Sequence, residues 1–313
     1  MKYRRLGKTA LRVSVVGVGT WQFGGEWGKQ FTQDEVDAIL ATARDLGVNL
    51  IDTAECYGDH LSERLIGNAV RGQRDDWIIA TKFGHEFHGL MDRTPRFSPQ
   101  AVRGQLEASL RALQTDVIDI YQFHSGGDHV FDNDELWTML DKQVQAGKIR
   151  FLGISISSSR NMDPSHQARR ASDVGASVLQ IVYNRLDRRP ETQIFPYIEA
   201  QDLGVLARVP LASGFLTGKY KPGHRFTDPS DVRSTWEPEH IQRQLREADE
   251  IARTEVPEGV PMAQWALAWP LQHPLVTCVI PGVKSVAQMQ ANAAAADLDE
   301  MVRDDHPQAW PEA

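Results

Sequence analysis

Three ionisable side chains stand at the ends of apolar runs in this 313-residue chain. Asp52, Lys82 and His124 each close such a run, and Tyr57 follows Asp52 within the same short segment. A carboxylate, an ammonium, an imidazole and a phenol can move protons to and from a substrate when they share one pocket. The first question is therefore whether the fold brings the four together.

Taken one at a time, each of these residues has an ordinary structural explanation. An aspartate after a strand often forms a turn or caps a helix, and a lysine in a loop is usually solvated. The combination is more informative, because a buried lysine needs an anionic partner and Asp52 is available to Lys82.

The chemistry that suits this set is proton donation to a developing alkoxide. A phenol has an ordinary pKa of about 10, and a neighbouring ammonium lowers that pKa, against the rise that burial causes. We expect Asp52 to hold Lys82 charged, Lys82 to act on Tyr57, and His124 to donate a hydrogen bond to a substrate oxygen. An alkoxide develops when a hydride is transferred to a carbonyl. Because the set contains no strong nucleophile and no metal cage, a cofactor must supply the electrons for this transfer.

Apolar runs of strand length alternate with amphipathic stretches along the whole chain. The amphipathic stretches have clear helix starts: Thr32 with Glu35 forms a capping box, and Ser98 precedes Pro99. Asn133 or Asp134, and Ser285, are the expected starts of two later helices. The runs are apolar on both faces, as in parallel sheets. The expected strands are Val15–Gly19, Asn49–Asp52, Trp77–Lys82, Ile118–His124, Ile149–Ser155, Val178–Tyr183, Gly204–Arg208 and Val276–Pro281.

Eight strand-then-helix units predict a single α/β domain over residues 1–313, folded as a (β/α)8 barrel. A hairpin around Gly7 is expected to plug the bottom of the barrel, residues 214–238 to form a long insertion, and residues from about 297 a short polar tail. The rival doubly wound fold lacks its fingerprint, because Gln22 stands where the third glycine after Gly17 and Gly19 belongs. In a barrel the active site lies at the carboxyl ends of the strands, where Asp52, Lys82 and His124 stand.

Composition narrows the function classes. With 41% hydrophobic and 24% charged residues the chain is of ordinary globular type. A net charge of -8 without a basic tract argues against nucleic-acid binding. No apolar run reaches the length of a membrane span, and Cys56 and Cys278 form no disulfide or metal framework. We therefore expect a cytoplasmic protein with a small-molecule substrate.

The motifs occur in an order that resembles the aldo-keto reductases over nearly the whole chain. They are GVGTW (17–21), IDTAECYG (51–58), ATKFG (80–84), DVIDIYQFH (116–124), IRFLGIS (149–155), LQIVYN (179–184), PLASGFLTGKY (210–220) and IPGVKS (280–285). The resemblance implies a catalytic tetrad of Asp52, Tyr57, Lys82 and His124, with Tyr57 as proton donor. It also implies reversible reduction of an aldehyde or ketone by a nicotinamide cofactor, usually NADPH, bound across the barrel mouth.

The same resemblance implies a set of binding residues. Ser155 and Gln180 would meet the carboxamide, Leu211 and Ser213 the pyrophosphate, and the PGVKS helix start the adenine end, since helix N-termini attract phosphate. The substrate pocket would contain Trp21, Tyr57, Phe87, His88 and His124. The full cofactor set is Gly19, Thr20, Trp21, Asp52, Ser155, Gln180, Arg208, Pro210, Leu211, Ser213, Gly214, the Lys219-Tyr220 step, Gly282, Lys284, Ser285, Gln288 and Asn292.

Three positions depart from the family pattern. Ile156 follows Ser155 where many members have asparagine, and Arg208 occupies the position of an aromatic that stacks on the nicotinamide. Gln288 stands where many members use arginine on the 2′-phosphate. Lys284 and Ser285 still favour NADPH, with NADH as the alternative.

The sequence also bears on other functions. A cofactor-binding regulatory subunit, like the β subunits of potassium channels, is the alternative function. A glycosidase needs paired carboxylates at strand ends, and only Asp52 qualifies. The stretch 85–88 lacks the spacing of a zinc motif, so no metal is expected there, and we expect it to be part of a substrate-pocket loop.

Overall fold

The computed structural model describes residues 1–157, 159 and 163–310. Its main sheet has eight parallel strands in the order β12-β11-β10-β9-β8-β5-β4-β3. Bridges from Val16 to Val279 and from Gly19 to Gly282 bring the first strand against the last, so the sheet is nearly closed. The predicted (β/α)8 barrel is confirmed. Its strands are β3 (Val18–Gly19), β4 (Leu50–Asp52), β5 (Ile78–Phe83), β8 (Ile118–His124), β9 (Ile149–Ser155), β10 (Ala176–Val182), β11 (Gly204–Arg208) and β12 (Cys278–Ile280).

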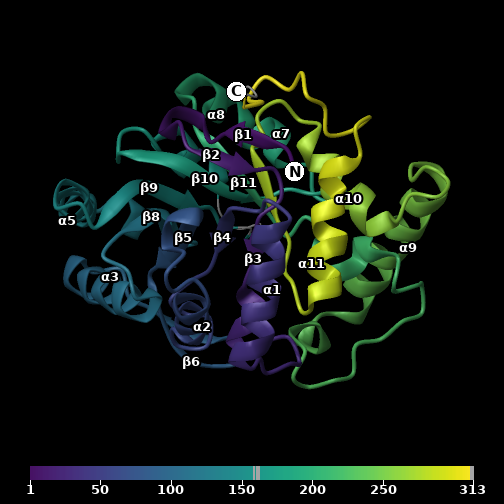
Figure 1. Ribbon diagram of the computed structural model, residues 1–313, viewed down its shortest axis with the longest axis horizontal. Coiled ribbons are helices and arrows are strands. Elements are labelled where there is room, and N and C mark those ends of the chain that lie inside the picture. Colours follow the sequence, from purple (N-terminus) through teal and green to yellow (C-terminus); the bar gives the residue numbers. More distant parts are fainter. Residues whose placement is uncertain (158, 160–162, 311–313) are drawn as a thin grey trace.

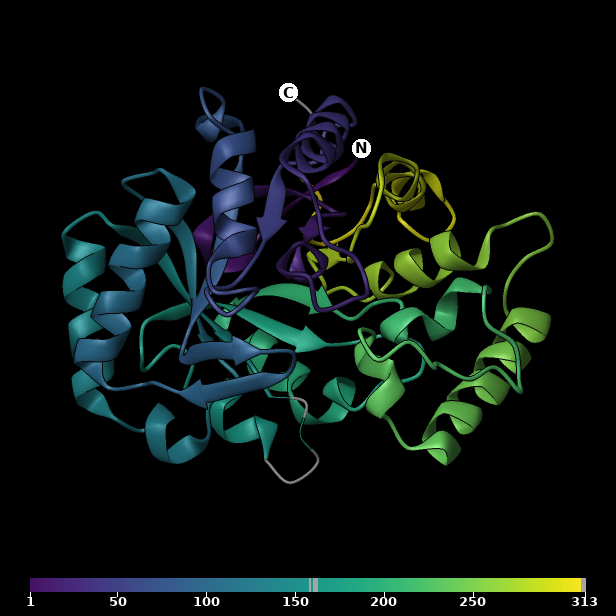
Figure 2. The same ribbon diagram turned by 90° about the horizontal axis from the view of Figure 1, so that it is seen from below.

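Helices surround this barrel, as Figures 1 and 2 show. The capping box at Thr32 and Glu35 is present, and the side chains of Ser98, Asn133 and Ser285 each accept a backbone N–H at a helix start, as predicted. The helices are α1 (Gln33–Asp45), α2 (Leu61–Ala69), α3 (Pro99–Leu113), α4 (Asp128–Phe131), α5 (Asp134–Gln145), α6 (Pro164–Arg169), α7 (Pro190–Gln193), α8 (Phe195–Gln201), α9 (Pro238–Thr254), α10 (Met262–Leu271) and α11 (Val286–Ala293).

The barrel interior is filled in layers by the inward-facing side chains of its strands. A buried apolar cluster occupies the lower part and includes Leu50, Ala80, Ile120, Val178 and Leu206. Side chains alternate between the two faces of a strand, so the residue two positions further on faces the same way. Two positions after each of these apolar residues, the same strand has a polar residue on the same face. These polar residues are Asp52, Lys82, Gln122, Gln180 and Arg208.

The N-terminal hairpin closes the bottom of the barrel, as predicted. Strands β1 (Tyr3–Arg5) and β2 (Arg12–Ser14) pair antiparallel, and Leu6 belongs to the interior cluster with no exposed surface. A Cβ on Gly7 would lie 2.2 Å from the backbone nitrogen of Gly204, so glycine allows this close approach. The N-terminus lies on this side, in the upper part of Figure 1.

The predicted polar tail is wrong for its described part. The Trp310 N–H donates to the Tyr3 carbonyl at 2.9 Å, and Ala309 bridges to Arg4. The Thr277 hydroxyl donates to Gln308 Oε1 at 2.7 Å, and Val302 is fully buried. The tail therefore packs beside the hairpin under the barrel.

A second hairpin and a long insertion cover the other end of the barrel. The stretch expected as a loop forms strands β6 (His85–Gly89) and β7 (Asp92–Pro95), which pair antiparallel. The predicted insertion after β11 is irregular, with a short 3₁₀ turn at Val232–Thr235, and leads into α9. Strand β6 lies at the bottom of Figure 1, on the side away from β1 and β2. Within the described ranges, no helix combines the length and apolar character needed to cross a membrane.

We expect Leu6→Ala to lower the free energy of unfolding by about 2–5 kcal/mol, because it leaves a cavity in a fully buried cluster. Urea denaturation would measure the change. The control is Leu46→Ala, whose side chain is exposed at the end of α1 and should cost less than about 0.5 kcal/mol. Equal losses in both variants would contradict a role for Leu6 as a plug.

Candidate active site

Asp52 and Lys82 form a buried ion pair inside the carboxyl end of the barrel. Lys82 Nζ lies 2.7 Å from Asp52 Oδ1, and the exposed fractions of the two side chains are 1% and 6%. The same ammonium donates to the Thr53 carbonyl at 2.6 Å. The other carboxylate oxygen, Oδ2, accepts from Gln180 Nε2 at 2.5 Å and from Gln122 Nε2 at 3.2 Å. Both charges are therefore paired and hydrogen-bonded, which a buried pair requires.

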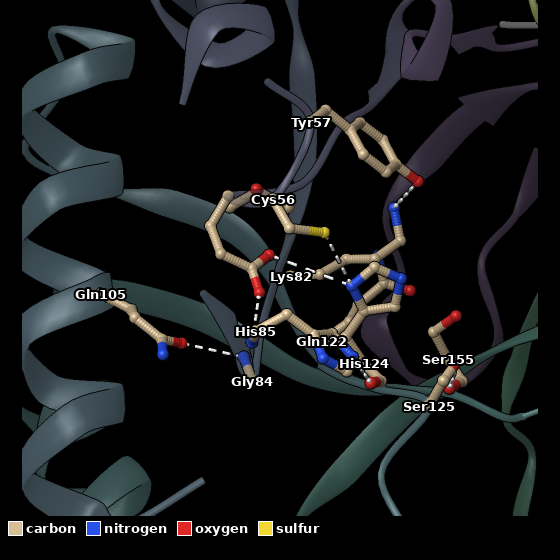
Figure 3. A network of polar contacts seen from close by, with 12 residues as sticks. Cys56, Tyr57, Lys82, Gly84, His85, Gln105, Gln122, His124, Ser125 and Ser155 are labelled. Atoms are coloured by element: carbon tan, nitrogen blue, oxygen red, sulfur yellow. Dashed lines mark hydrogen bonds and ion pairs between the residues drawn. The ribbon is translucent and has the colours of Figure 1, made fainter. Parts of the chain in front are cut away.

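Tyr57 lies in the loop between β4 and α2, with its hydroxyl at this ion pair. Lys82 Nζ lies 3.4 Å from the Tyr57 oxygen, as Figure 3 shows. The loop is fixed by direct backbone contact, since a Cβ on Gly24 would lie 2.7 Å from the Tyr57 carbonyl carbon. On its other side the phenol ring stacks on Trp21, with centroids 6.1 Å apart.

Burial raises the pKa of Tyr57 to about 12, while the neighbouring Lys82 ammonium works in the lowering direction. The expected effect of Lys82 is present, but the loss of water around the phenol is larger, so the free site holds a protonated phenol. Burial lowers the pKa of Lys82, and Asp52 and Tyr57 together reverse that effect, so the pKa of Lys82 ends above its ordinary value. Lys82 therefore keeps its positive charge next to a neutral phenol.

His124 is the third strand-end group that the fold brings here. Its ring centroid is 6.3 Å from that of Tyr57, and its Nδ1 lies 3.7 Å from Cys56 Sγ. Figure 3 shows the other ring nitrogen on the side away from Cys56. Burial, followed by the positive charge of Lys82, holds the pKa of His124 well below its usual range, so the imidazole is neutral. The His124 carbonyl accepts from His85 Nε2 at 2.8 Å.

The hairpin β6–β7 is held against the barrel mouth by Glu26, a buried carboxylate in the loop before α1. Glu26 accepts from the indole Nε1 of Trp21 at 2.6 Å and from the Met91 N–H at 3.1 Å. Arg93 forms an ion pair with the same carboxylate. One buried acid thus ties the hairpin to the indole that stacks on Tyr57.

The expected pocket residues on this hairpin need correction. His88 is exposed and hydrogen-bonds to the Thr94 hydroxyl, on the side of β6 opposite to His85. The Arg93 guanidinium lies 5.8 Å from the centre of the Phe87 ring, so it covers that ring. Neither Phe87 nor His88 lines the cavity at the barrel mouth, whereas His85, Met91 and Arg93 do.

That cavity has a volume of about 650 Å³ and extends from the tetrad to the start of α11. Three proposed site residues lie behind its wall or beside it, namely Lys82, Ser155 and Ser285. Apart from Phe87 and His88, all other proposed site residues line the cavity. They are Gly19, Thr20, Trp21, Asp52, Tyr57, His124, Gln180, Arg208, Pro210, Leu211, Ser213, Gly214, Lys219, Tyr220, Gly282, Lys284, Gln288 and Asn292.

The cavity wall fits a nicotinamide cofactor. The Nε atom of Arg208 is buried and has no hydrogen-bond partner within the described chain, while its guanidinium donates to the Ile156 carbonyl at 3.0 Å. An unpaired buried donor on a cavity wall is suited to a polar ligand. At the far end the Lys284 ammonium, half-buried, donates to the Trp27 carbonyl at 2.6 Å beside the N-terminus of α11.

Residues in or next to the cavity that sequence reasoning missed come mainly from loops. Glu26 and Arg93 hold the hairpin, Trp27 packs edge-on against Trp21, and Arg233 donates to the Ser213 carbonyl at 3.0 Å. Their contacts join segments far apart in the sequence, which no local pattern reveals. Gln122 was detectable, because it is a polar residue within an apolar strand, two positions before His124.

One group of potential metal ligands also occurs at this site. Ligand atoms of Glu55, Cys56 and His124 lie within 4.8 Å of one another. The positive charges of Lys82 and Arg93 act on the same groups, which disfavours a divalent cation. Glu86 and His88 of the 85–88 stretch are not part of the group.

A proton-exchanging cluster at the carboxyl end of a (β/α)8 barrel places this chain among barrel enzymes. Residues 15–309 match the model of the Aldo/keto reductase family, and the chain belongs to that family. Its members are NAD(P)H-dependent oxidoreductases that act on carbonyl groups. The predicted resemblance and the oxidoreductase class are confirmed.

Three similar proteins show the range of the family. Aldo-keto reductase YhdN of Bacillus subtilis is 30% identical over 93% of this chain and 87% of its own. A probable voltage-gated potassium channel subunit beta of Arabidopsis thaliana is 31% identical over 95% and 92%. The holo form of aldo-keto reductase AKR11C1 from Bacillus halodurans has 30% identity and a TM-score of 0.78, with 95% and 91% of the two chains covered.

We expect Asp52→Asn to lower the free energy of unfolding by about 3–5 kcal/mol, because it leaves the Lys82 ammonium buried without an anion. The double variant Asp52→Asn/Lys82→Met removes both charges and should recover at least half of that loss. A double-mutant cycle in urea would measure the coupling. Additive losses in the cycle would contradict a coupled pair.

Proposed function

We propose that this chain reduces an aldehyde or ketone to an alcohol, with Tyr57 as the proton donor and with the reverse oxidation on the same groups. The observation that carries the proposal is the row formed by Asp52, Lys82 and Tyr57, in which the ammonium lies 2.7 Å from the carboxylate and 3.4 Å from the phenol. Such a row can deliver a proton and then stabilise the phenolate that remains.

Each residue of the row has a separate task. A nicotinamide cofactor supplies the hydride for the carbonyl carbon when it is bound. Tyr57 holds the proton for the carbonyl oxygen, and its high pKa keeps that proton in place until the oxygen becomes basic. Lys82 stays charged through Asp52 and attracts the phenolate as it forms. His124, which is neutral, orients the substrate oxygen against the phenol.

Cofactor binding is assigned to the cavity residues between the tetrad and α11. Gln180, aligned by Asp52 and by the Ser155 hydroxyl at 3.2 Å, would meet the carboxamide. Arg208 would place its planar guanidinium against the nicotinamide region, with Nε, which has no hydrogen-bond partner among the described residues, as a donor. Leu211, Ser213 and the loop after them would hold the pyrophosphate, followed by the adenine-end residues at 282–292.

We propose NADPH as the preferred cofactor. Lys284 and the N-terminus of α11 provide positive charge for a 2′-phosphate. Gln288 is less available, because its Oε1 accepts the Lys284 N–H at 2.8 Å. The preference therefore depends mainly on the lysine.

Lys284→Gln should weaken NADPH binding about tenfold or more and change NADH binding less than about twofold, since a hydrogen bond to a charged group contributes about 1.5–3 kcal/mol. Fluorescence titration with both cofactors would measure the two affinities. Lys148→Gln is the control, because this lysine forms an ion pair with Glu107 directly before β9, at the other end of the barrel, and should leave the ratio unchanged. Equal weakening of NADH and NADPH would rule out the assignment of Lys284.

The similarity to a probable potassium channel β subunit gives a second candidate, a cofactor-binding regulatory subunit with little turnover. The complete row from Asp52 to Tyr57 favours the reductase. Tight NADPH binding without turnover across a broad panel of aldehydes and ketones would favour the regulatory function instead.

Tyr57→Phe should lower kcat for reduction of a reactive aldehyde by about 10²–10⁴-fold, because the proton donor is lost. Cofactor absorbance would follow turnover, and cofactor affinity should stay within about twofold. Tyr3→Phe is the control, since its hydroxyl bonds to the Gly47 carbonyl at the other end of the barrel. Unchanged turnover in Tyr57→Phe would exclude the proposed mechanism.

A further inference from the structure

Glu55 is a buried acid that the mechanism above does not use. It lies two positions before Tyr57 and has an exposed fraction of 2%. Its Oε1 accepts the His85 N–H at 2.9 Å. Its Oε2 has no hydrogen-bond partner within the described residues and lies 3.9 Å from His124 Nδ1. An unsatisfied buried carboxylate oxygen facing the ring of a site histidine needs an explanation.

The two nitrogens of a neutral imidazole have opposite roles. One carries a proton and donates, and the other accepts. Nδ1 of His124 faces Glu55 and Cys56, and the second nitrogen, Nε2, lies on the side away from Cys56 (Figure 3). Whatever group bonds to Nδ1 therefore decides whether Nε2 offers a proton or a lone pair to a substrate oxygen.

We propose that Glu55 is a positioning residue that sets the tautomer of His124, by donating a hydrogen bond to Nδ1 when protonated and accepting one from Nδ1 when ionised. The inference rests on the proposed function. The present 3.9 Å is longer than a hydrogen bond, and catalytic hydrogen bonds are often long before substrate binds.

The charges around the two groups place this change near neutral pH. Burial raises the pKa of Glu55 to about 7, against the bond from the His85 N–H. Glu63 from α2 adds to the rise, and Lys82 from β5 opposes it. Further titratable or charged groups near Glu55 or His124 are Cys56, Tyr57, His60, His85, Arg93, Tyr121 and Arg208.

The two states suit opposite directions of the reaction. With Glu55 protonated, Nδ1 accepts and Nε2–H donates to a carbonyl oxygen, as reduction needs. With Glu55 ionised, Nδ1–H donates to the carboxylate and the Nε2 lone pair accepts an alcohol O–H. The pair loses one proton to solvent between the two states, and no bond to carbon changes. Reduction should therefore weaken as pH rises through the pKa of Glu55.

Cys56 is the competing partner of Nδ1, at 3.7 Å. A thiol is a weak donor and a weak acceptor. Burial raises the pKa of the Cys56 thiol far above its ordinary value, so the thiol does not change state near neutral pH. It cannot supply a change of tautomer in this range, and Glu55 can.

The first test is the pH profile of kcat/KM for aldehyde reduction in wild type and Glu55→Gln. Wild type should fall about tenfold from about pH 6 to about pH 8 as one group loses its proton. The glutamine oxygen can still accept the His85 N–H, and its amide can donate to Nδ1 at every pH, so this variant should change less than about twofold. An unchanged fall in Glu55→Gln would overturn the proposal.

The second test is independent of turnover. Nitrogen-15 NMR of the imidazole distinguishes a protonated from a bare Nδ1, and in wild type the His124 signals should exchange roles over the same pH range. In Glu55→Gln the bare-Nδ1 form should persist. Signals of one unchanging tautomer in wild type would overturn the proposal even if the enzyme is fully active. Loss of the Tyr57→Phe effect with exchanging His124 signals would instead refute only the proposed function.

Cys56→Ala serves as the matched control, because it removes the other neighbour of Nδ1. Its pH profile should keep the wild-type fall and midpoint. A profile that becomes flat in Cys56→Ala but not in Glu55→Gln would assign the tautomer to the thiol and overturn the role of Glu55.

Discussion

The buried ion pair of Asp52 and Lys82 is the interaction on which the rest of the site depends. An ammonium with 1% of its side chain exposed remains charged only where a carboxylate and further acceptors surround it. The barrel provides these from neighbouring strands: Asp52 and Gln122 stand on the strands either side of β5, and Gln180 approaches from across the interior. The phenol of Tyr57 then lies beside a fixed positive charge, which in the proposed mechanism stabilises the phenolate after the phenol has given up its proton.

The need to bury and pair these two charges also explains how the barrel is filled. The lower part of the interior is an apolar cluster, and two residues further along several strands the inward-facing side chains are polar. The apolar part, closed by Leu6 of the N-terminal hairpin, keeps water out from beneath the ion pair. The other end is covered by the hairpin β6–β7, which Glu26 ties to Trp21. The two hairpins thus enclose the charged layer from opposite ends of the barrel.

Much of the barrel was predictable, because strands buried on both faces and helices with side-chain caps leave local patterns, as at Thr32 and Ser98. The strand-end residues Asp52, Lys82 and His124 followed from the geometry of parallel strands. The hairpin β6–β7 was missed because its polar residues resemble a loop. Arg93 rather than Phe87 lines the cavity, and its position depends on a long-range ion pair with Glu26. The sequence indicated that Lys82 lowers the pKa of Tyr57, but the size of the opposing burial effect depends on the packing of the folded loop.

Burial shifts the pKa of each titratable group of this site differently, so the groups differ in charge. It keeps Tyr57 and Cys56 protonated and His124 neutral. Lys82 alone among the tetrad is held positive, because its partners outweigh burial. Burial raises the pKa of Glu55 to about 7, because the His85 N–H and Lys82 offset only part of the effect of burial. A group whose pKa lies near neutral can change its charge in that range, and in our proposal the position of Glu55 beside His124 Nδ1 connects that change to the second imidazole nitrogen.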